Sequence, residues 1–556
     1  MRIIWVYLLT ICMGLISCKQ QNMVDYVLYN ATIYTVNEKQ PTAEAMAIAR
    51  DGRILAVGST SELLNAYPGA HTINMQGHTI IPGLIDAHAH LMGLGVSMMR
   101  VNLVGTRSVE EVIERLKRAE AQLPEGAWLL GRGWDQNDWP DKVFPTHQML
   151  DKAFPDRPVW IRRIDGHAAW ANMAAMRPLW DSLLTASDPE GGKIIRDAQG
   201  RPTGVFVDAA MRFIDEQVPE MSEKEAEQAL QLAIQTCNRY GLTGVHDAGV
   251  SQADIERYRR AIDAGTFSLR VYAMIGGMGE TFNTYCQSGP LIHDRLQVQS
   301  VKFYIDGALG SRGAALLQPY ADDPDNRGLL QHTPEEFTAM VKQAMECGFQ
   351  VNTHAIGDRG NRVVLDAYEQ AMQAVKQHPG RHRVEHAQVV ALEDIPRFRM
   401  LDVIASMQPT HATSDMYWAE DRLGQERLKG AYAWRRFLDA GVRLAFGSDF
   451  PVEHPNPMLG IYAAVTRQDT TGWPPGGWLP DQRLTRAEAL KAFTLDAAYA
   501  AFQEHEVGSL EPGKHADFVV LDRDIMQIPA ADIFKTRVVA TYLDGKKVYE
   551  WTSEGD

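Results

Sequence analysis

Short apolar segments that each suit one β-strand recur along the middle of this 556-residue chain, and helical patterns lie between several of them. Alternation of strands with helices predicts a parallel sheet, and eight repeats predict a TIM barrel, the (β/α)8 fold of the α/β class. Catalytic groups of such a barrel lie at the C-terminal ends of its strands. Reactive residues are therefore expected just after the apolar segments, whose predicted ends are Asp86, Val245, Met274, Tyr304, Asn352, Val384, Met407 and Phe446.

Both ends of the chain are rich in β-branched and aromatic residues and in turn signals, unlike the middle. Residues 538–549 are typical of a hairpin, with Asp544 and Gly545 at its turn. We expect one small β-sandwich domain built from residues 25–80 and 505–556. The barrel then comprises residues 81–96 and 240–504.

About 140 residues separate the first predicted barrel strand from the second, which is too long for a loop. We therefore expect an inserted domain, residues 97–239, on the substrate side of the barrel. Trp134, Asp138 and Trp139 lie in this insert and are candidates for a pocket wall. Ordinary core packing is the alternative for the tryptophans, because large aromatic side chains are mainly buried.

The N-terminus has the pattern of a secretory signal: a basic Arg2, a short apolar segment over residues 3–16, and a polar stretch after Cys18. The apolar segment is shorter than the ~20 residues that a membrane-spanning helix needs. Ser17 followed by Cys18 resembles the bacterial lipobox, which implies a signal peptide over residues 1–17 and lipid on Cys18. Residues 18–24 would then tether the protein to a membrane of the bacterial cell envelope. An uncleaved anchor is the alternative.

The remaining three cysteines, Cys237, Cys286 and Cys347, form neither a CxxC metal motif nor an evident disulfide framework, so we expect buried thiols. The net charge of −15 repels phosphate backbones. Nucleic acid is therefore not expected as a partner, and a small molecule is. A homodimer stays open.

His88 and His90 directly follow the first predicted strand. Residues i and i+2 of a strand face the same side, so both imidazoles are expected to point toward one place. Imidazole is a common ligand of zinc and similar ions. Taken alone this pair is a weak motif, because two such histidines are often surface or packing residues.

Further residues of ligand type follow other predicted strands, namely His354, His386 and Asp449. Each has a structural alternative: His354 as a helix cap near Gly357, His386 as a buried neutral histidine, and Asp449 as an N-cap. Their joint occurrence at strand ends favours one metal centre.

Lys302 lies inside an otherwise apolar strand, where an unpaired ammonium group is costly. The structural alternative is a lysine whose head reaches the mouth of the barrel and pairs with Asp306 or another carboxylate.

The ordered set His88, His90, Lys302, His354, His386 and Asp449 resembles the amidohydrolase superfamily, in the family 3 branch that includes N-substituted formamide deformylases. The segments 244–249, 302–312 and 508–517 match as well, and the resemblance covers residues 25–550. It implies one or two divalent metal ions, expected to be zinc. His88, His90 and Asp449 would hold one ion and His354 and His386 the other. Lys302, carbamylated by CO2, would bridge them, although several relatives use one metal.

The resemblance also implies a reaction: a metal-activated hydroxide attacks an amide-like carbonyl, and Asp449 carries the proton to the departing nitrogen. The expected enzyme cleaves a carbon–nitrogen bond outside a peptide backbone, in an amide, formamide or cyclic amide. A cyclic amidine deaminase with one metal and a non-catalytic solute-binding lipoprotein are the alternatives. Further candidates for substrate contact are the polar residues Asp165, His167, Arg312 and His411.

Overall fold

The computed structural model describes residues 24–552 except 122, 125, 165, 167, 190 and 191. The predicted signal peptide, the lipidation site Cys18, and the candidates Asp165 and His167 lie outside the described residues. The chain divides into two compact units, one formed by residues up to Leu91 together with Ile234 onward, and the other by Met92–Ala233. Among the described residues, no helix is both long and apolar enough to cross a membrane.

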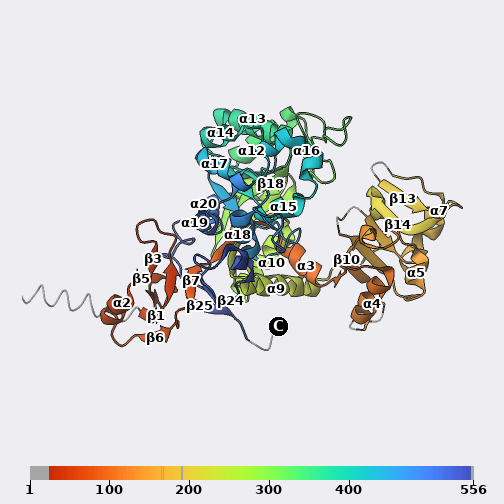
Figure 1. The fold of residues 1–556 in the computed structure, drawn as a ribbon. Coiled ribbons are helices and arrows are strands. Elements are labelled where there is room, and N and C mark those ends of the chain that lie inside the picture. Colours follow the sequence, from red (N-terminus) through yellow and green to blue (C-terminus); the bar gives the residue numbers. More distant parts are fainter. Residues whose placement is uncertain are drawn as a thin grey trace, which may run out of the picture. The chain divides into compact units, whose positions relative to one another are not determined.

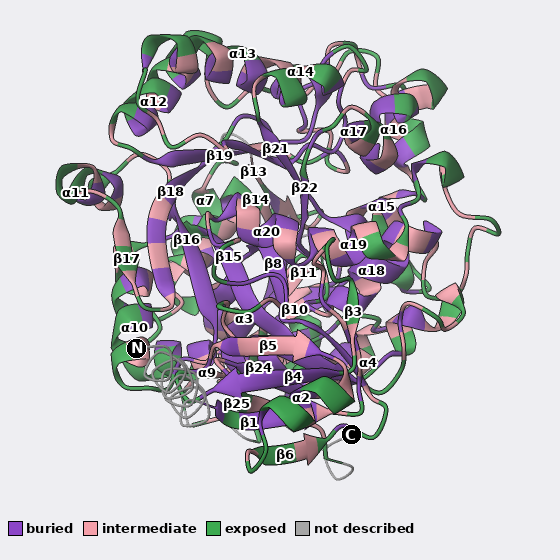
Figure 2. Ribbon diagram, turned by 90° about the vertical axis from the view of Figure 1, so that its left-hand side faces the viewer, coloured by how far each residue is buried: buried purple, intermediate pink, exposed green. Residues whose placement is uncertain are grey.

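Eight parallel strands of the first unit form a nearly closed barrel, which confirms the predicted fold (Figure 2). Its last strand approaches its first where the backbone N–H of Asp449 donates to the carbonyl of His88 at 2.8 Å. Most strand residues are buried, as expected for a sheet covered on both faces. In order around the barrel, the strands are β8 (Leu84–Ala89), β15 (Leu242–Val250), β16 (Arg270–Gly276), β18 (Leu296–Tyr304), β19 (Gln350–Ala355), β20 (Arg383–His386), β21 (Ile404–Met407) and β22 (Leu444–Phe446).

Helices that connect these strands carry clear start signals in the sequence. The helix before β19 begins with Thr333, whose hydroxyl accepts from the N–H of Glu336 while the Glu336 carboxylate accepts from the Thr333 N–H, and Pro334 occupies its first position. Such caps fix where each helix begins and so where the preceding loop must end. The main connecting helices are α10 (Gln252–Asp263), α11 (Glu280–Ser288), α12 (Pro334–Glu346), α13 (Asp358–Ala374), α14 (Ile395–Met400), α15 (Pro409–Asp415), α17 (Trp434–Asp439), α18 (Pro457–Thr466), α19 (Arg486–Ala492) and α20 (Leu495–Ala500).

Two sheets built from both chain ends form the predicted β-sandwich. One has the order β5-β4-β1-β6 and the other β25-β24-β23-β7-β2-β3. Residues of both sheets share one apolar core, which includes Leu28, Ile48, Ile80, Phe518 and Val520. The strands are β1 (Val24–Tyr29), β2 (Thr32–Tyr34), β3 (Thr42–Ala43), β4 (Ala45–Ala49), β5 (Ile54–Gly58), β6 (His71–Asn74), β7 (Thr79–Pro82), β23 (Phe518–Leu521), β24 (Val538–Leu543) and β25 (Lys546–Glu550).

The second unit contains a six-stranded sheet of order β13-β14-β12-β11-β10-β9, with helices such as α4 (Val109–Glu120), α5 (His147–Asp151) and α7 (Trp180–Thr185) around it (Figure 1). Trp134, Trp139 and Trp170 pack together in one of its apolar cores, with Trp134 and Trp139 stacked at 5.8 Å between ring centres. The strands are β9 (Val101–Asn102), β10 (Leu129–Trp134), β11 (Val159–Arg163), β12 (Ala168–Ala171), β13 (Gly192–Arg196) and β14 (Pro202–Asp208).

Cys286 and Cys347 form a disulfide, so the expectation of free thiols is wrong for this pair. The fold brings α11 and the C-terminal end of α12 together and leaves the two Cα atoms 5.0 Å apart, within the range that a disulfide spans. Their separation of 61 residues carries no local sequence signal. Cys237 is a buried free thiol, as expected.

Candidate metal centre

Each predicted ligand lies at or just beyond the C-terminal end of a barrel strand. His88 and His90 are at the end of β8, Lys302 is in β18, His354 is in β19 and His386 ends β20. Asp449 follows β22 through Gly447 and Ser448. Parallel strands of a barrel bring their C-terminal ends to one mouth, so residues far apart in the chain meet there.

The loop that carries Asp449 is fixed by a close approach to β8. A side chain on Gly447 would place its Cβ 2.4 Å from Oδ1 of Asp86 and 2.5 Å from the backbone nitrogen of His88, so only glycine fits. Asp86 is fully buried and accepts hydrogen bonds from the backbone N–H of Ser448 at 3.0 Å and from its hydroxyl at 2.6 Å. This contact holds Asp449 against the histidines of β8.

The carboxylate of Asp449 lies at the centre of the ligand set. Its Oδ1 is 3.1 Å from Nε2 of His90 and 3.6 Å from Nε2 of His88. Ligand atoms of His88, His386 and Asp449 all lie within 4.8 Å of one another. Three side chains from β8, β20 and the loop after β22 therefore offer donor atoms to one point.

The other predicted ligands border the same point. The ring of His386 lies 4.8 Å from that of His88 and 4.6 Å from that of His354, between ring centres. Nζ of Lys302 is 2.9 Å from Nε2 of His88. The structure thus brings together all six residues that the sequence suggested as ligands.

Two of these residues have a left-handed backbone that side chains seldom adopt. The φ angle of His386 is 74° and that of Asp449 is 60°. Such conformations cost of order 1–3 kcal/mol each and persist where the surroundings enforce them, often at functional sites. They turn each side chain inward immediately after its strand ends.

The Nδ1 atom of each of three histidines is held by a neighbouring acceptor, which leaves Nε2 facing the centre. Nδ1 of His88 contacts Oε2 of Glu385 at 2.5 Å, that of His386 contacts Oε1 of Gln408 at 2.8 Å, and that of His90 contacts the carbonyl of Ala248 at 2.9 Å. Metal-binding histidines are usually held in this way, because the second nitrogen sets the tautomer and ring orientation.

Glu385 and Gln408 were not anticipated from the sequence. Glu385 is fully buried, and its Oε1 lies 2.7 Å from Nε of the equally buried Arg383. Burial alone would raise the pKa of Glu385, but the adjacent Arg383 guanidinium and His88 hold it well below its usual range. The carboxylate is therefore ionised, and it can hold the N–H of His88 through a charge-assisted hydrogen bond.

His88, His354 and His386 are neutral at physiological pH, which is the form that binds metal, because burial lowers the pKa of each. Burial and the nearby Lys302 lower the pKa of His88 to about 4 and that of His354 to about 3. Burial would also lower the pKa of His90, but the hydrogen bond and the charge of Asp449 raise it above its usual value. Burial would raise the pKa of Asp449, but a hydrogen bond from His90 and the charges of His88 and His386 hold it well below the usual value. The set combines four imidazoles, three of them neutral, with one carboxylate.

Lys302 does not make the carboxylate pair that its structural alternative required. Asp306 instead accepts backbone hydrogen bonds from Ala315, Ile356 and Gly357. Nζ of Lys302 lies 4.8 Å from the ring centre of Tyr304, and no described carboxylate is within ion-pair distance of it. Burial lowers the pKa of Lys302 to about 8.

The donor set fits a divalent ion. Nε2 of His354 is buried and makes no hydrogen bond to any described residue, although a buried polar atom without a partner is costly. Four imidazoles and one carboxylate are the ligand types of zinc and related metals. These residues would hold the ion through Nε2 atoms and Asp449 Oδ1.

The weaker candidates for substrate contact are scattered. His411, in α15, lies near the centre, with Nε2 3.8 Å from Oδ2 of Asp449. Arg312 forms an ion pair with Asp322 at 2.8 Å, which is its structural alternative. Asp138 is exposed in a short helical turn of the insert. Trp134 and Trp139 pack in an apolar core of the insert, which is the alternative to a role in a pocket wall.

Known protein families and relatives match most of the chain. The model of the amidohydrolase family matches residues 71–549, and that of an imidazolonepropionase-like composite domain of bacteria matches residues 49–70. The chain is 37% identical to the protein LONG AFTER FAR-RED 3 of Arabidopsis thaliana, covering 95% of this chain and 92% of that protein. It is 34% identical to the putative amidohydrolase YtcJ of Bacillus subtilis, covering 94% of this chain and 99% of that protein.

Two further similarities bear on chemistry. The N-substituted formamide deformylase of Arthrobacter pascens is 29% identical, with 95% of this chain and 99% of that protein covered. An uncharacterized metal-dependent hydrolase from Pyrococcus horikoshii has a crystal structure that matches with a TM-score of 0.76 at 28% identity, covering 91% of this chain and 99% of that one. The ligand-like cluster, the barrel and these matches agree, and the chain belongs to the amidohydrolase family as a metal-dependent hydrolase.

Proposed function

We propose that this enzyme hydrolyses a carbon–nitrogen bond outside a peptide backbone, in a small amide, formamide or cyclic amide. The observation that carries the proposal is the convergence of four imidazoles, Asp449 and Lys302 at the barrel mouth. The similarity to a formamide deformylase over nearly the whole chain supports the bond type.

His88, His90, Lys302, His354, His386 and Asp449 are the proposed metal ligands, and zinc suits the nitrogen-rich set. A divalent ion bound there supplies a Lewis acid and lowers the pKa of water. Asp449 is the proposed proton shuttle: it accepts a proton from the attacking water and delivers it to the departing nitrogen. His411, whose Nε2 lies 3.8 Å from Oδ2 of Asp449, is a proposed hydrogen-bonding partner of the substrate.

Lys302 is the proposed bridge between two metals after carbamylation. The reaction with CO2 needs a neutral amine, and burial brings the pKa of Lys302 to about 8, much closer to neutrality than a free lysine. The buried ammonium group of Lys302 has no ion pair with a described carboxylate. Carbamylation would replace it with a carbamate, whose oxygens are suited to a metal ion. This removes the cost of the buried cation.

A hydrolysis screen tests the bond type. The metal-loaded protein is offered N-formyl amines, N-acyl amino acids, cyclic imides and lactones, with release of amine or acid measured. Turnover of a compound with a carbon–nitrogen bond, lost in Asp449→Asn, is the expected result. Hydrolysis of lactones alone would overturn the proposed bond type.

We also propose that the protein is a lipoprotein of the bacterial cell envelope, anchored through Cys18. The Cys286–Cys347 disulfide supports this, because disulfides persist in oxidising compartments outside the cytoplasm. Membrane fractionation and mass spectrometry of the mature N-terminus, in wild type and Cys18→Ser, test it. A soluble protein that retains residues 1–17 would contradict it.

A further inference from the structure

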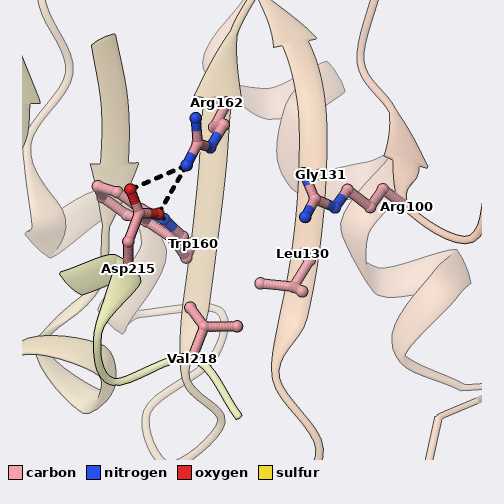
Figure 3. A pocket seen from close by; sticks show the side chains of 7 residues that line it. All are labelled: Arg100, Leu130, Gly131, Trp160, Arg162, Asp215 and Val218. Atoms are coloured by element: carbon pink, nitrogen blue, oxygen red, sulfur yellow. Dashed lines mark hydrogen bonds and ion pairs between the residues drawn. The ribbon is translucent and has the colours of Figure 1, made fainter. Parts of the chain in front are cut away.

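A cavity of about 280 Å³ opens on one face of the insert sheet, within residues 92–233 (Figure 3). Its walls come from β10, β11 and the segments before and after the sheet. The residues that line it are Arg100, Leu130, Gly131, Trp160, Arg162, Asp215 and Val218. None of them belongs to the candidate metal centre.

Strand register places two kinds of side-chain pair on this face. β10 and β11 run parallel, with Leu130 opposite Trp160 and Arg132 opposite Arg162. Residues two apart in a strand share a face, so an apolar pair lies next to a pair of arginines. Leu130 and Trp160 give the cavity an apolar wall, and Arg162 places a guanidinium group beside it.

Asp215 supplies one negative charge and is already engaged. Its carboxylate accepts from Nη2 of Arg162 at 2.8 and 2.9 Å and from the indole Nε1 of Trp160 at 2.9 Å (Figure 3). One carboxylate balances one guanidinium.

Arg100 adds a second guanidinium group to the cavity. Figure 3 shows no hydrogen bond or ion pair between its side chain and the other residues that line the cavity. Burial lowers the pKa of Arg100, and the charge of Arg162 lowers it further. Two guanidinium groups, those of Arg100 and Arg162, thus line a cavity with a single carboxylate, which leaves an excess of one positive charge next to the apolar surface of Trp160 and Leu130.

We propose that this cavity binds the carboxylate of a small organic anion, with Arg100 and Arg162 holding the carboxylate and Trp160 and Leu130 contacting the apolar part. Arginine matches a carboxylate through paired N–H donors, and the attraction between the two charges is stronger where both are partly shielded from water. The volume is close to the lower limit of about 300 Å³ for small-molecule sites, so the ligand is small. This is a second binding site, in addition to the proposed hydrolytic centre.

Isothermal titration of the full-length, metal-loaded protein with benzoate and with benzamide tests the proposal. The two probes have nearly the same shape, but only benzoate is charged. Benzoate is expected to bind at least about tenfold more tightly than benzamide, a difference of about 1.4 kcal/mol. Equal affinity for the two probes would overturn the proposal.

The variant Arg100→Gln separates this cavity from the metal centre, where a carboxylate can also bind. Arg100→Gln is expected to weaken benzoate binding about tenfold. The control Arg118→Gln removes the same charge from a position whose side chain is 70% exposed and should leave affinity unchanged. Benzoate affinity that is equal in wild type and Arg100→Gln would place the binding elsewhere and overturn the proposal, whether or not the hydrolysis screen finds a substrate.

Discussion

Replacing Glu385 by glutamine tests the buried group that orients His88. The Glu385 and Arg383 side chains are both fully buried and 2.7 Å apart, so the variant leaves Arg383 without its counter-charge. Removal of one partner of a buried ion pair costs 3–5 kcal/mol, and we expect about 3 kcal/mol because Arg383 still donates to the carbonyl of Ala87 and to Ser406. Loss of the charged acceptor for His88 should also weaken metal binding by about 10- to 100-fold.

Urea unfolding of the metal-free protein measures the first effect, and competition against a chelator of known affinity measures the second. Glu114→Gln is the matched control, because it removes the same charge from an exposed ion pair with Arg118 and should cost at most about 1 kcal/mol. A Glu385→Gln variant that loses less than about 1 kcal/mol and binds metal as tightly as wild type would refute the orienting role.

Other consequences can be measured independently. Burial raises the pKa of Asp415 to about 6, so its folded form holds a proton that the unfolded chain releases near pH 4. Its contribution to stability is therefore present below about pH 4 and lost as pH rises through 6. Asp415→Asn should gain stability relative to wild type over that range, as measured by urea titrations. A difference in unfolding free energy between the two proteins that stays constant with pH would contradict this. Cys286→Ala with Cys347→Ala opens a link across 61 residues and should lower the free energy of unfolding by about 4 kcal/mol, whereas a loss below about 1 kcal/mol would show that the disulfide contributes little. Lys302→Ala should reduce both hydrolysis and bound metal, and full retention of both would exclude a bridging carbamate.

The barrel could be predicted from the sequence because its physical signals are local. Buried strands are short apolar segments, and the ligands stand directly after them, as His386 does after Val384 and Glu385. Two i, i+2 histidines in a strand must face one side, and the structure brings both to Asp449. Periodicity and strand-end position were sufficient for these features.

The missed features depend on contacts between distant segments. Nothing near Cys286 indicates that α11 will lie beside Cys347, because that contact depends on the packing of helices across two barrel repeats. Glu385 carried a signal that was not used: Arg383 and Glu385 are two charged residues, i and i+2, inside a buried strand. Unpaired charges are too costly there, so opposite charges on one strand face indicate a buried pair.

Metal content measured alongside hydrolysis tests the central claim most directly. Purified wild-type protein is expected to hold about one to two equivalents of a divalent ion by mass spectrometry, as the donor set predicts. His88→Ala and Asp449→Ala should each lose most of the metal together with activity, while Arg118→Gln keeps both. A metal-free wild-type protein with full hydrolytic activity would contradict the assignment of this cluster as the catalytic metal centre.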